Sequence, residues 1–132
     1  MKLEGLEDVK DLEVLPGDIR ELSPSVKNTS TTEHIYAFIG LEYNSSAWSV
    51  DIPTGWKKVE EGIYAYATGN TMNDLNIGDS AEMDLTLTVK AEGDAFQALS
   101  DSDFVVKVTG YGISTEIAGA NADQAWSDYL AN

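Results

Sequence analysis

Residues 80–90 alternate polar and apolar side chains without a break. Successive residues of a strand point to opposite faces, so this stretch predicts a strand with one apolar and one polar face. Such a strand is typical of an antiparallel sheet that lies on a core and shows its other face to water. The apolar face comprises Ala81, Met83, Leu85, Leu87 and Val89.

Residues 34–43 are apolar at both odd and even positions, so both faces of a strand formed by them would be apolar. This predicts a strand covered on two sides, at the centre of a second sheet. We expect Leu85 and Leu87 to point inward and Thr86 to point away from the core. The packing partners that we expect for the two leucines are Ile39, Phe38 or Val106. Further strands are predicted at residues 12–14, 18–22, 48–52, 56–59, 63–68 and 103–113.

Turn residues and one helical pattern complete the predicted elements. Pro16-Gly17-Asp18 predicts a turn, and residues 60–62 predict the loop of a hairpin. Residues 95–99 predict a short helical turn. Residues 121–130 predict a C-terminal helix, because Asn121 is a favoured cap and apolar residues follow at helical spacing. Many short strands without long alternating helices indicate an all-β fold, an antiparallel β-sandwich or jelly roll.

The chain of 132 residues predicts one domain, residues 1–132, and its hydrophobic fraction of 42% is sufficient for a core. Its 23 acidic and 8 basic residues give a net charge of −15. That charge argues against nucleic acid and anionic lipid as partners, because both need a basic surface. The acids can serve solubility or cation binding. No stretch approaches the roughly 20 apolar residues of a membrane-spanning helix, so we expect no membrane insertion.

Few residues have the chemistry of a catalytic or metal site. Cysteine is absent, and His34, preceded by Glu33, is the one histidine. A zinc hydrolase commonly uses two histidines on one helical face, so a metalloprotease is not favoured. Asp101 and Asp103 are weak candidates for calcium ligands, because they place two acids on one loop. The sequence predicts a protein that is not an enzyme and has no cofactor.

Aromatic residues concentrate between residues 48 and 66. They can form a stacking platform for sugar, as in a carbohydrate-binding β-sandwich module. Alternatively they pack in the core or pair across neighbouring strands. We expect Trp48 to be the most exposed of them. The group comprises Trp48, Trp56, Tyr64 and Tyr66.

An ordered set of short motifs over residues 15–130 resembles the camelysin and TasA family of exported proteins from Gram-positive bacteria. The motifs begin with Leu15-Pro16-Gly17-Asp18, then Val26-Lys27-Asn28-Thr29 before an aromatic strand at 35–39. Gly55-Trp56 and Gly62-Ile63-Tyr64-Ala65-Tyr66 follow, then Leu75-Asn76-Ile77-Gly78-Asp79, and Ala125-Trp126 near the end.

The resemblance implies a jelly-roll domain exported with a cleaved leader, located outside the cell or at the cell surface. It also implies a structural role in the biofilm matrix, with strand exchange between subunits. The chain starts at Met1 without an apolar leader, so either the protein is intracellular or Met1 stands in place of a leader that is removed. Residues 1–15 are expected to be either an arm that pairs with a neighbouring copy or an edge strand of their own sheet.

Overall fold

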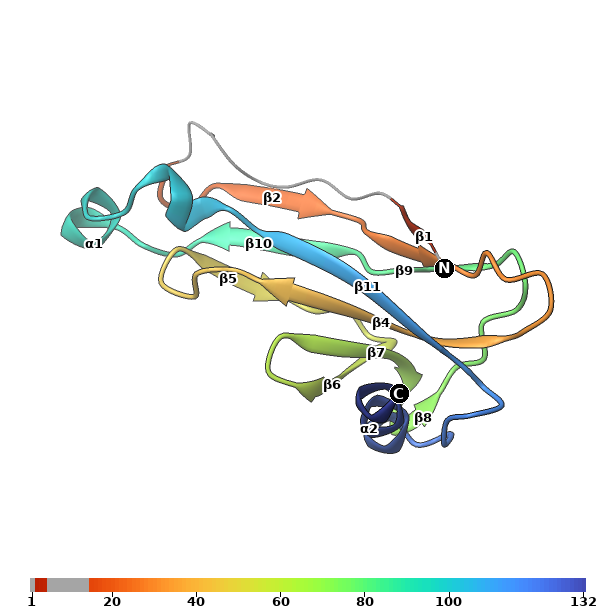
Figure 1. The fold of residues 1–132 in the computed structure, drawn as a ribbon. Helices are drawn as coiled ribbons and strands as arrows, with labels where there is room; N and C mark the ends of the chain where they lie inside the picture. Colours follow the sequence, from red (N-terminus) through yellow and green to blue (C-terminus); the bar gives the residue numbers. More distant parts are fainter. Residues whose placement is uncertain (1, 5–14) are drawn as a thin grey trace.

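The computed structural model describes residues 2–4 and 15–132 and consists mainly of antiparallel strands (Figure 1). One layer contains two short sheets, whose strand orders are β1-β3-β9 and β2-β10-β5. Residues 23–24 separate β2 from β3, and residues 83–84 separate β9 from β10. The amide of Met83 donates to the carbonyl of Pro24 at 2.9 Å, which joins the two sheets across these interruptions. The strands of this layer are β1 (Lys2–Glu4), β2 (Ile19–Leu22), β3 (Ser25–Lys27), β5 (Trp48–Asp51), β9 (Ser80–Glu82) and β10 (Leu85–Val89).

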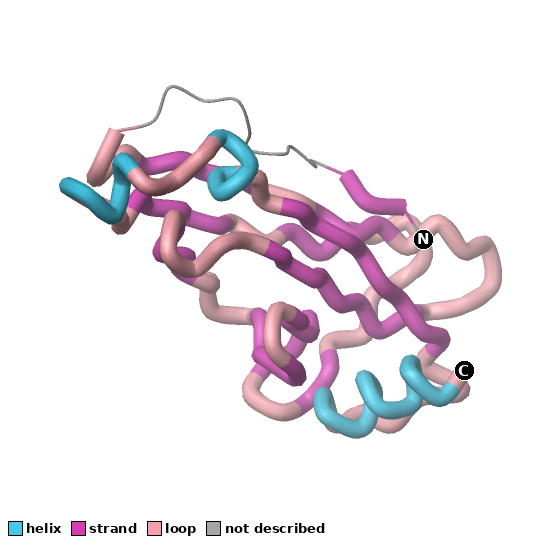
Figure 2. Tube along the Cα trace, turned by 60° about the vertical axis from the view of Figure 1, so that its left-hand side comes forward, coloured by secondary structure: helices cyan, strands magenta, loops and turns pink. Residues whose placement is uncertain are grey.

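The second layer is a sheet of strand order β11-β4-β7-β6, with β8 paired to β7. Its strands are β4 (Ile35–Glu42), β6 (Trp56–Glu60), β7 (Ile63–Thr68), β8 (Thr71–Met72) and β11 (Lys107–Ser114). The helical segments are α1 (Gly93–Gln97), the 3-10 helix η1 (Asp101–Phe104) and α2 (Ala122–Ala131). The first two lie at one end of the molecule and α2 lies at the other (Figure 2). The predicted all-β antiparallel fold with a short C-terminal helix is therefore confirmed.

The alternating stretch 80–90 forms two strands instead of the one predicted: β10 is the middle strand of its sheet, and β9 is the last strand of the other. Its five apolar side chains are all at most 2% exposed, whereas Glu82 and Asp84 are exposed. Leu85 and Leu87 belong to the core between the layers together with Ile39 and Val106. Phe38 is not a partner of these leucines, because its side chain belongs to a second core on the other side of its sheet.

That second core explains why β4 has apolar side chains on both of its faces. β4 lies between β11 and β7, with Ala37 and Ile39 facing the first layer and Phe38 facing α2. Helix α2 buries Ala122, Ala125 and Trp126 there. The prediction of a central strand covered on two sides is confirmed.

The C-terminal helix begins where the sequence predicts. The side chain of Asn121 accepts hydrogen bonds from the amides of Asp123 and Gln124, which is how an N-cap satisfies free amides of the first turn. The three buried residues follow at intervals of three and four, so they share the face that packs on the sheet, whereas Leu130 is 59% exposed. Neither α2 nor the shorter helical segments of the described residues have the length and apolarity needed to cross a bilayer.

Two predicted boundaries were wrong, and one prediction cannot be compared. The strand expected from Asp103 begins at Lys107, because residues 101–104 form η1 with a capping box between Ser100 and Asp103. The loop expected over residues 69–79 contains β8. The strand expected at residues 12–14 lies outside the described residues.

Candidate functional site

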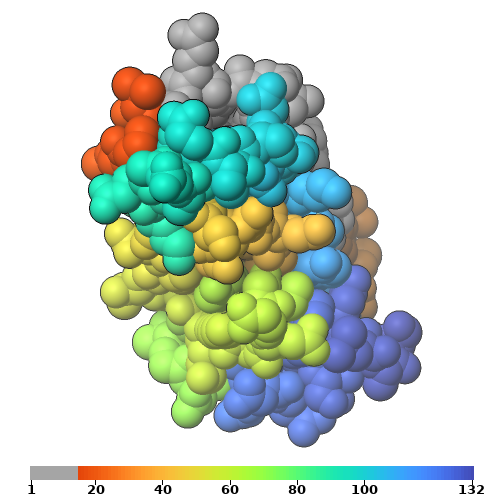
Figure 3. Space-filling model, turned by 90° about the vertical axis from the view of Figure 1, so that its left-hand side faces the viewer, coloured from red at the N-terminus to blue at the C-terminus, as the bar shows by residue number. Residues whose placement is uncertain are grey.

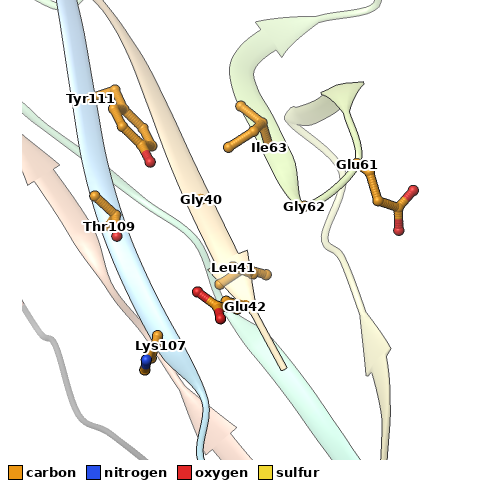
Figure 4. Close-up of a pocket in the computed structure, with 9 residues that line it drawn as sticks. All are labelled: Gly40, Leu41, Glu42, Glu61, Gly62, Ile63, Lys107, Thr109 and Tyr111. Carbon is orange, nitrogen blue, oxygen red and sulfur yellow. The ribbon is translucent and has the colours of Figure 1, made fainter. Parts of the chain in front are cut away.

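Three shallow depressions meet where β4 ends, with volumes of about 240, 300 and 290 Å³. Glu42, the last residue of β4, lines all three. Figure 3 views the molecule from this end, with the gold atoms of the chain near residue 45 between the teal and yellow-green segments. Figure 4 shows the first depression, which is lined by Gly40, Leu41, Glu42, Glu61, Gly62, Ile63, Lys107, Thr109 and Tyr111.

The depressions form because the pairing of β4 with β7 stops before β4 does. Gly40 pairs with Ile63, and the amide of Leu41 then donates to the carbonyl of Gly62 at 2.7 Å. On its other side β4 stays paired to β11 as far as Glu42, the partner of Lys107. A gap therefore opens between the end of β4 and the turn that joins β6 to β7.

Glycine shapes the floor of the first depression. A Cβ atom at Gly40 would lie 3.0 Å from the ring of Tyr111 and 3.2 Å from the side chain of Ile63. These two neighbours can therefore approach each other across β4 only because residue 40 has no side chain. A glycine within an apolar strand is the sequence signal for such a close approach.

The charges around the depressions are mixed. The ammonium of Lys58 lies 2.7 Å from a carboxylate oxygen of Glu61, on the turn that borders the gap. A hydrogen bond to Glu61, together with its negative charge, raises the pKa of Lys58 above the ordinary value. Glu42 and Lys107 add one charge of each sign, so the site can contact neutral polar groups as well as ions.

Two tyrosines and two carboxylates line the third depression. Tyr43 and Tyr64 stand there beside Glu42 and Glu61. Burial, and to a lesser extent the neighbouring Tyr43, raises the pKa of the Tyr64 hydroxyl. Aromatic rings with adjacent carboxylates and hydroxyls are the groups that can stack on a sugar ring and hydrogen-bond to its hydroxyls.

The structure separates the four aromatic residues proposed as a stacking platform. Trp48 is 1% exposed, so the expectation that it is the most exposed was wrong. Its indole packs edge-on against Phe104 and donates to the carbonyl of Phe104 at 3.2 Å. The residues around Trp48, a polar turn followed by a strand, do not indicate that Phe104 packs on its indole.

The other three aromatic residues are half-buried at the edge of the core between the layers. Trp56 and Tyr66 are cross-strand partners with ring centroids 5.3 Å apart. The indole of Trp56 also donates to the carbonyl of Glu82 in the other layer, at 3.2 Å. The Trp56–Tyr66 pair therefore connects the layers. Of the four aromatic residues, Tyr64 is the one that lines a depression.

The candidate calcium ligands have different surroundings. Asp103 accepts hydrogen bonds from the amide of Ser100 at 2.8 Å and from the side chain of Asn44 at 2.9 Å. These bonds, with the one from the Ser100 amide as the largest contribution, lower the pKa of its carboxyl. Asp101 is exposed. The part of the chain that the structure describes contains no group of three or more acidic or histidine side chains that could hold a metal.

His34 lies immediately before β4 on the surface. Its Nδ1 atom is 2.7 Å from a carboxylate oxygen of Asp74, and both side chains are about half exposed. This contact joins the start of β4 to the loop before β9, next to the bridge between Ile35 and Leu75. The geometry is that of a surface contact between two segments.

Sequence reasoning had singled out Tyr64 but none of the other residues of the depressions. Glu42, Tyr43 and Lys107 come together only through the β4–β11 register and the turn at Gly62. Comparisons with protein-family models, with curated proteins and with solved structures yield no match to this chain.

Proposed function

We propose that this protein is a structural domain of the cell surface or the extracellular matrix, which associates with copies of itself or with matrix proteins. The observation that carries the proposal is the position of β1. Lys2–Glu4 form an outer strand beside β3, in an antiparallel ladder of three residue pairs. Lys2–Glu4 thus form an edge strand of their own sheet, which is the second of the two arrangements expected for residues 1–15, and exchange of this strand between copies is the proposed step.

A strand at the border of a sheet can be exchanged between identical chains. The ladder that β1 forms with β3 of its own chain is the same ladder that it would form with β3 of a second copy. The ladder is short, and the described chain resumes at Leu15, ahead of the turn at Pro16 and Gly17. Exchange in one direction produces a head-to-tail contact that can continue into a filament.

As part of this proposal, we infer that the strands have a jelly-roll arrangement and that the chain is related to the camelysin and TasA proteins. Support comes from the way in which strands distant in sequence pair within each layer, such as β5 with β10 and β4 with β11. The ordered motifs over residues 15–130 add to it.

Light scattering of the full chain and of a version without residues 1–14 tests the proposal. Because the net charge is −15, association of the full chain should increase from pH 7 to pH 4.5 and with added salt. The shortened chain should stay monomeric. A full chain that remains monomeric in all conditions, or a shortened chain that assembles equally well, would contradict the proposal.

Carbohydrate binding is the second candidate, and the third depression favours it through Tyr43 and Tyr64 beside two carboxylates. Titration with a panel of polysaccharides, followed by tryptophan and tyrosine fluorescence, tests it. A response that disappears in Tyr64→Ala supports the candidate. A flat response over the whole panel removes it.

A further inference from the structure

A groove lies at the opposite end of the molecule from the candidate site, between the end of β11 and the last turns of α2. Its volume is about 470 Å³. Two of its side chains are large, apolar and mostly exposed: Ile117 is 57% exposed and Leu130 is 59% exposed. The groove is lined by Glu33, Gly112, Ile113, Ser114, Ile117, Tyr129, Leu130 and Asn132.

The groove lies beside the edge of β11 that faces away from β4. The amide of Thr115 donates to the carbonyl of His34, on the side of β4. In a regular antiparallel ladder the backbone groups of alternate residues point to the same side, so those of Gly112 and Gly110 point away from β4. Among the described strands β11 forms a ladder only with β4, although β1 and β3 lie near it.

β11 also lacks the features that protect other edges of this molecule. The edge strand β6 contains Lys57 and Lys58 and a register shift before Glu60. Lysines and bulges on an edge discourage the addition of a further strand. By contrast, the register of β11 is regular over eight residues, and no charged residue follows Lys107 in it.

The electrostatic character of the groove is negative. Glu33 lines it, held by a hydrogen bond from the hydroxyl of Ser114 at 3.1 Å, and none of the described residues that line it is basic. The last turn of α2 contains no basic residue, so the partial negative charge of the helix C-terminus is uncompensated there. A second copy of this chain, with a net charge of −15, is a poor electrostatic match.

We propose that this groove binds an extended polypeptide segment that alternates basic and apolar residues. The segment adds as a strand to the free edge of β11, its apolar side chains lie between Ile117 and Leu130, and its basic side chains approach Glu33. Strand addition supplies affinity through main-chain hydrogen bonds, and pockets for alternate side chains supply specificity. This proposal does not rest on exchange of the N-terminal arm, because none of the described residues that line the groove belongs to that arm.

The probe is a synthetic six-residue peptide of alternating lysine and valine, titrated into the full chain by calorimetry. Amide shifts in nuclear magnetic resonance spectra locate the binding site. We expect saturable binding that shifts the amides of Gly110 and Gly112. A peptide with glutamate in place of lysine, and one with methylated backbone nitrogens, should each bind at least about tenfold more weakly.

Matched variants distinguish binding in the groove from non-specific effects of substitutions elsewhere on the surface. Leu130→Ser in the groove should weaken binding about tenfold, whereas Ile77→Ser should leave it unchanged. Ile77 is also a mostly exposed apolar residue, at 46% exposure, but it lies in the loop before β9. Glu33→Gln should weaken binding of the lysine peptide, and Glu60→Gln on β6 should not.

Each remaining outcome overturns the proposal. These outcomes are the absence of saturable binding, equal binding of the glutamate peptide, or equal effects of the Leu130 and Ile77 variants. Self-association of the chain that shifts the same amides would identify a second copy as the occupant and would also overturn it. Deletion of residues 1–14 should leave peptide binding intact, which keeps this test distinct from that of the proposed assembly.

Discussion

Gly62 shows how one residue fixes the geometry of the candidate site. Its φ angle is +78°, and a Cβ atom there would lie 2.7 Å from the carbonyl oxygen of Leu41. A side chain at this position would therefore separate the β6–β7 turn from β4. The hydrogen bond between Leu41 and Gly62, which ends the ladder, depends on this close approach.

Gly62→Ala should destabilise the protein more than Gly55→Ala. Gly55 also has a positive φ, +101°, but open space surrounds the Cβ position, so its substitution should cost about 1–3 kcal/mol of backbone strain alone. Gly62→Ala adds the clash with Leu41. Urea unfolding of both variants measures the difference, and equal midpoints would show that the turn moves away from β4 without loss of stability.

Asp103 should stabilise the fold only while its carboxylate is ionised. Its hydrogen bonds hold its folded pKa below the ordinary value of 3.8. The contribution is therefore complete above the unfolded pKa and is lost as the pH falls through the lower folded pKa. We expect Asp103→Asn to be less stable than the parent protein at pH 5–7 and the difference to shrink below about pH 4.

Urea unfolding at a series of pH values measures this difference. Asp101→Asn is the matched control, because Asp101 lies in the same 3-10 helix and is exposed. It should show little change at any of these pH values. A difference between the parent and Asp103→Asn that persists undiminished at low pH would mean that packing, not the carboxylate, is responsible.

At the scale of elements, alternation and helical spacing predicted the strands and α2 because both patterns reflect which face is buried. β10 and β4 are the clearest cases. Periodicity could not show which of two cores each face of a strand packs in. Phe38 was therefore predicted to contact Leu85 and Leu87, although it packs in the core beneath α2. Periodicity also could not show that Phe104 packs on the indole of Trp48, because a contact between residues so far apart in the sequence leaves no local pattern. The depressions around Glu42 depend on where the β4–β7 ladder ends, which no local pattern specifies.

Leu87→Ala should be much more damaging than Thr86→Ala. Leu87 is fully buried between the layers, whereas Thr86 lies half-exposed on the other face of β10. Removal of a buried leucine side chain costs about 2–5 kcal/mol through lost burial and the cavity that remains. Midpoints of urea unfolding check this prediction. Similar shifts for both variants would mean that the outer face of β10 is also covered.

At the scale of the whole molecule, three regions bear on the proposed functions. The end near Glu42 presents polar depressions, and the opposite end presents the groove between β11 and α2. Assembly in the proposed function uses a third region, the position of β1 beside β3. The depressions and the groove have no described lining residue in common, so variants can test these two regions independently.

The most direct test of assembly uses the absence of cysteine from the sequence. Lys2 and Lys27 are partners in the β1–β3 ladder. Directly opposed residues of an antiparallel pair have Cα atoms about 4.5–5.5 Å apart, which a disulfide can span. One preparation carries Lys2→Cys and another carries Lys27→Cys, and a third with both substitutions controls for the ability to form the bond.

The two single variants are mixed at pH 4.5 to permit exchange and then oxidised at neutral pH. Arm exchange predicts a covalent dimer that contains one chain of each variant, identified by mass spectrometry. It also predicts longer covalent chains when the double variant is oxidised at high concentration. If the double variant forms only an intramolecular disulfide and the mixture forms no mixed dimer, β1 stays with its own chain and the proposed assembly is wrong.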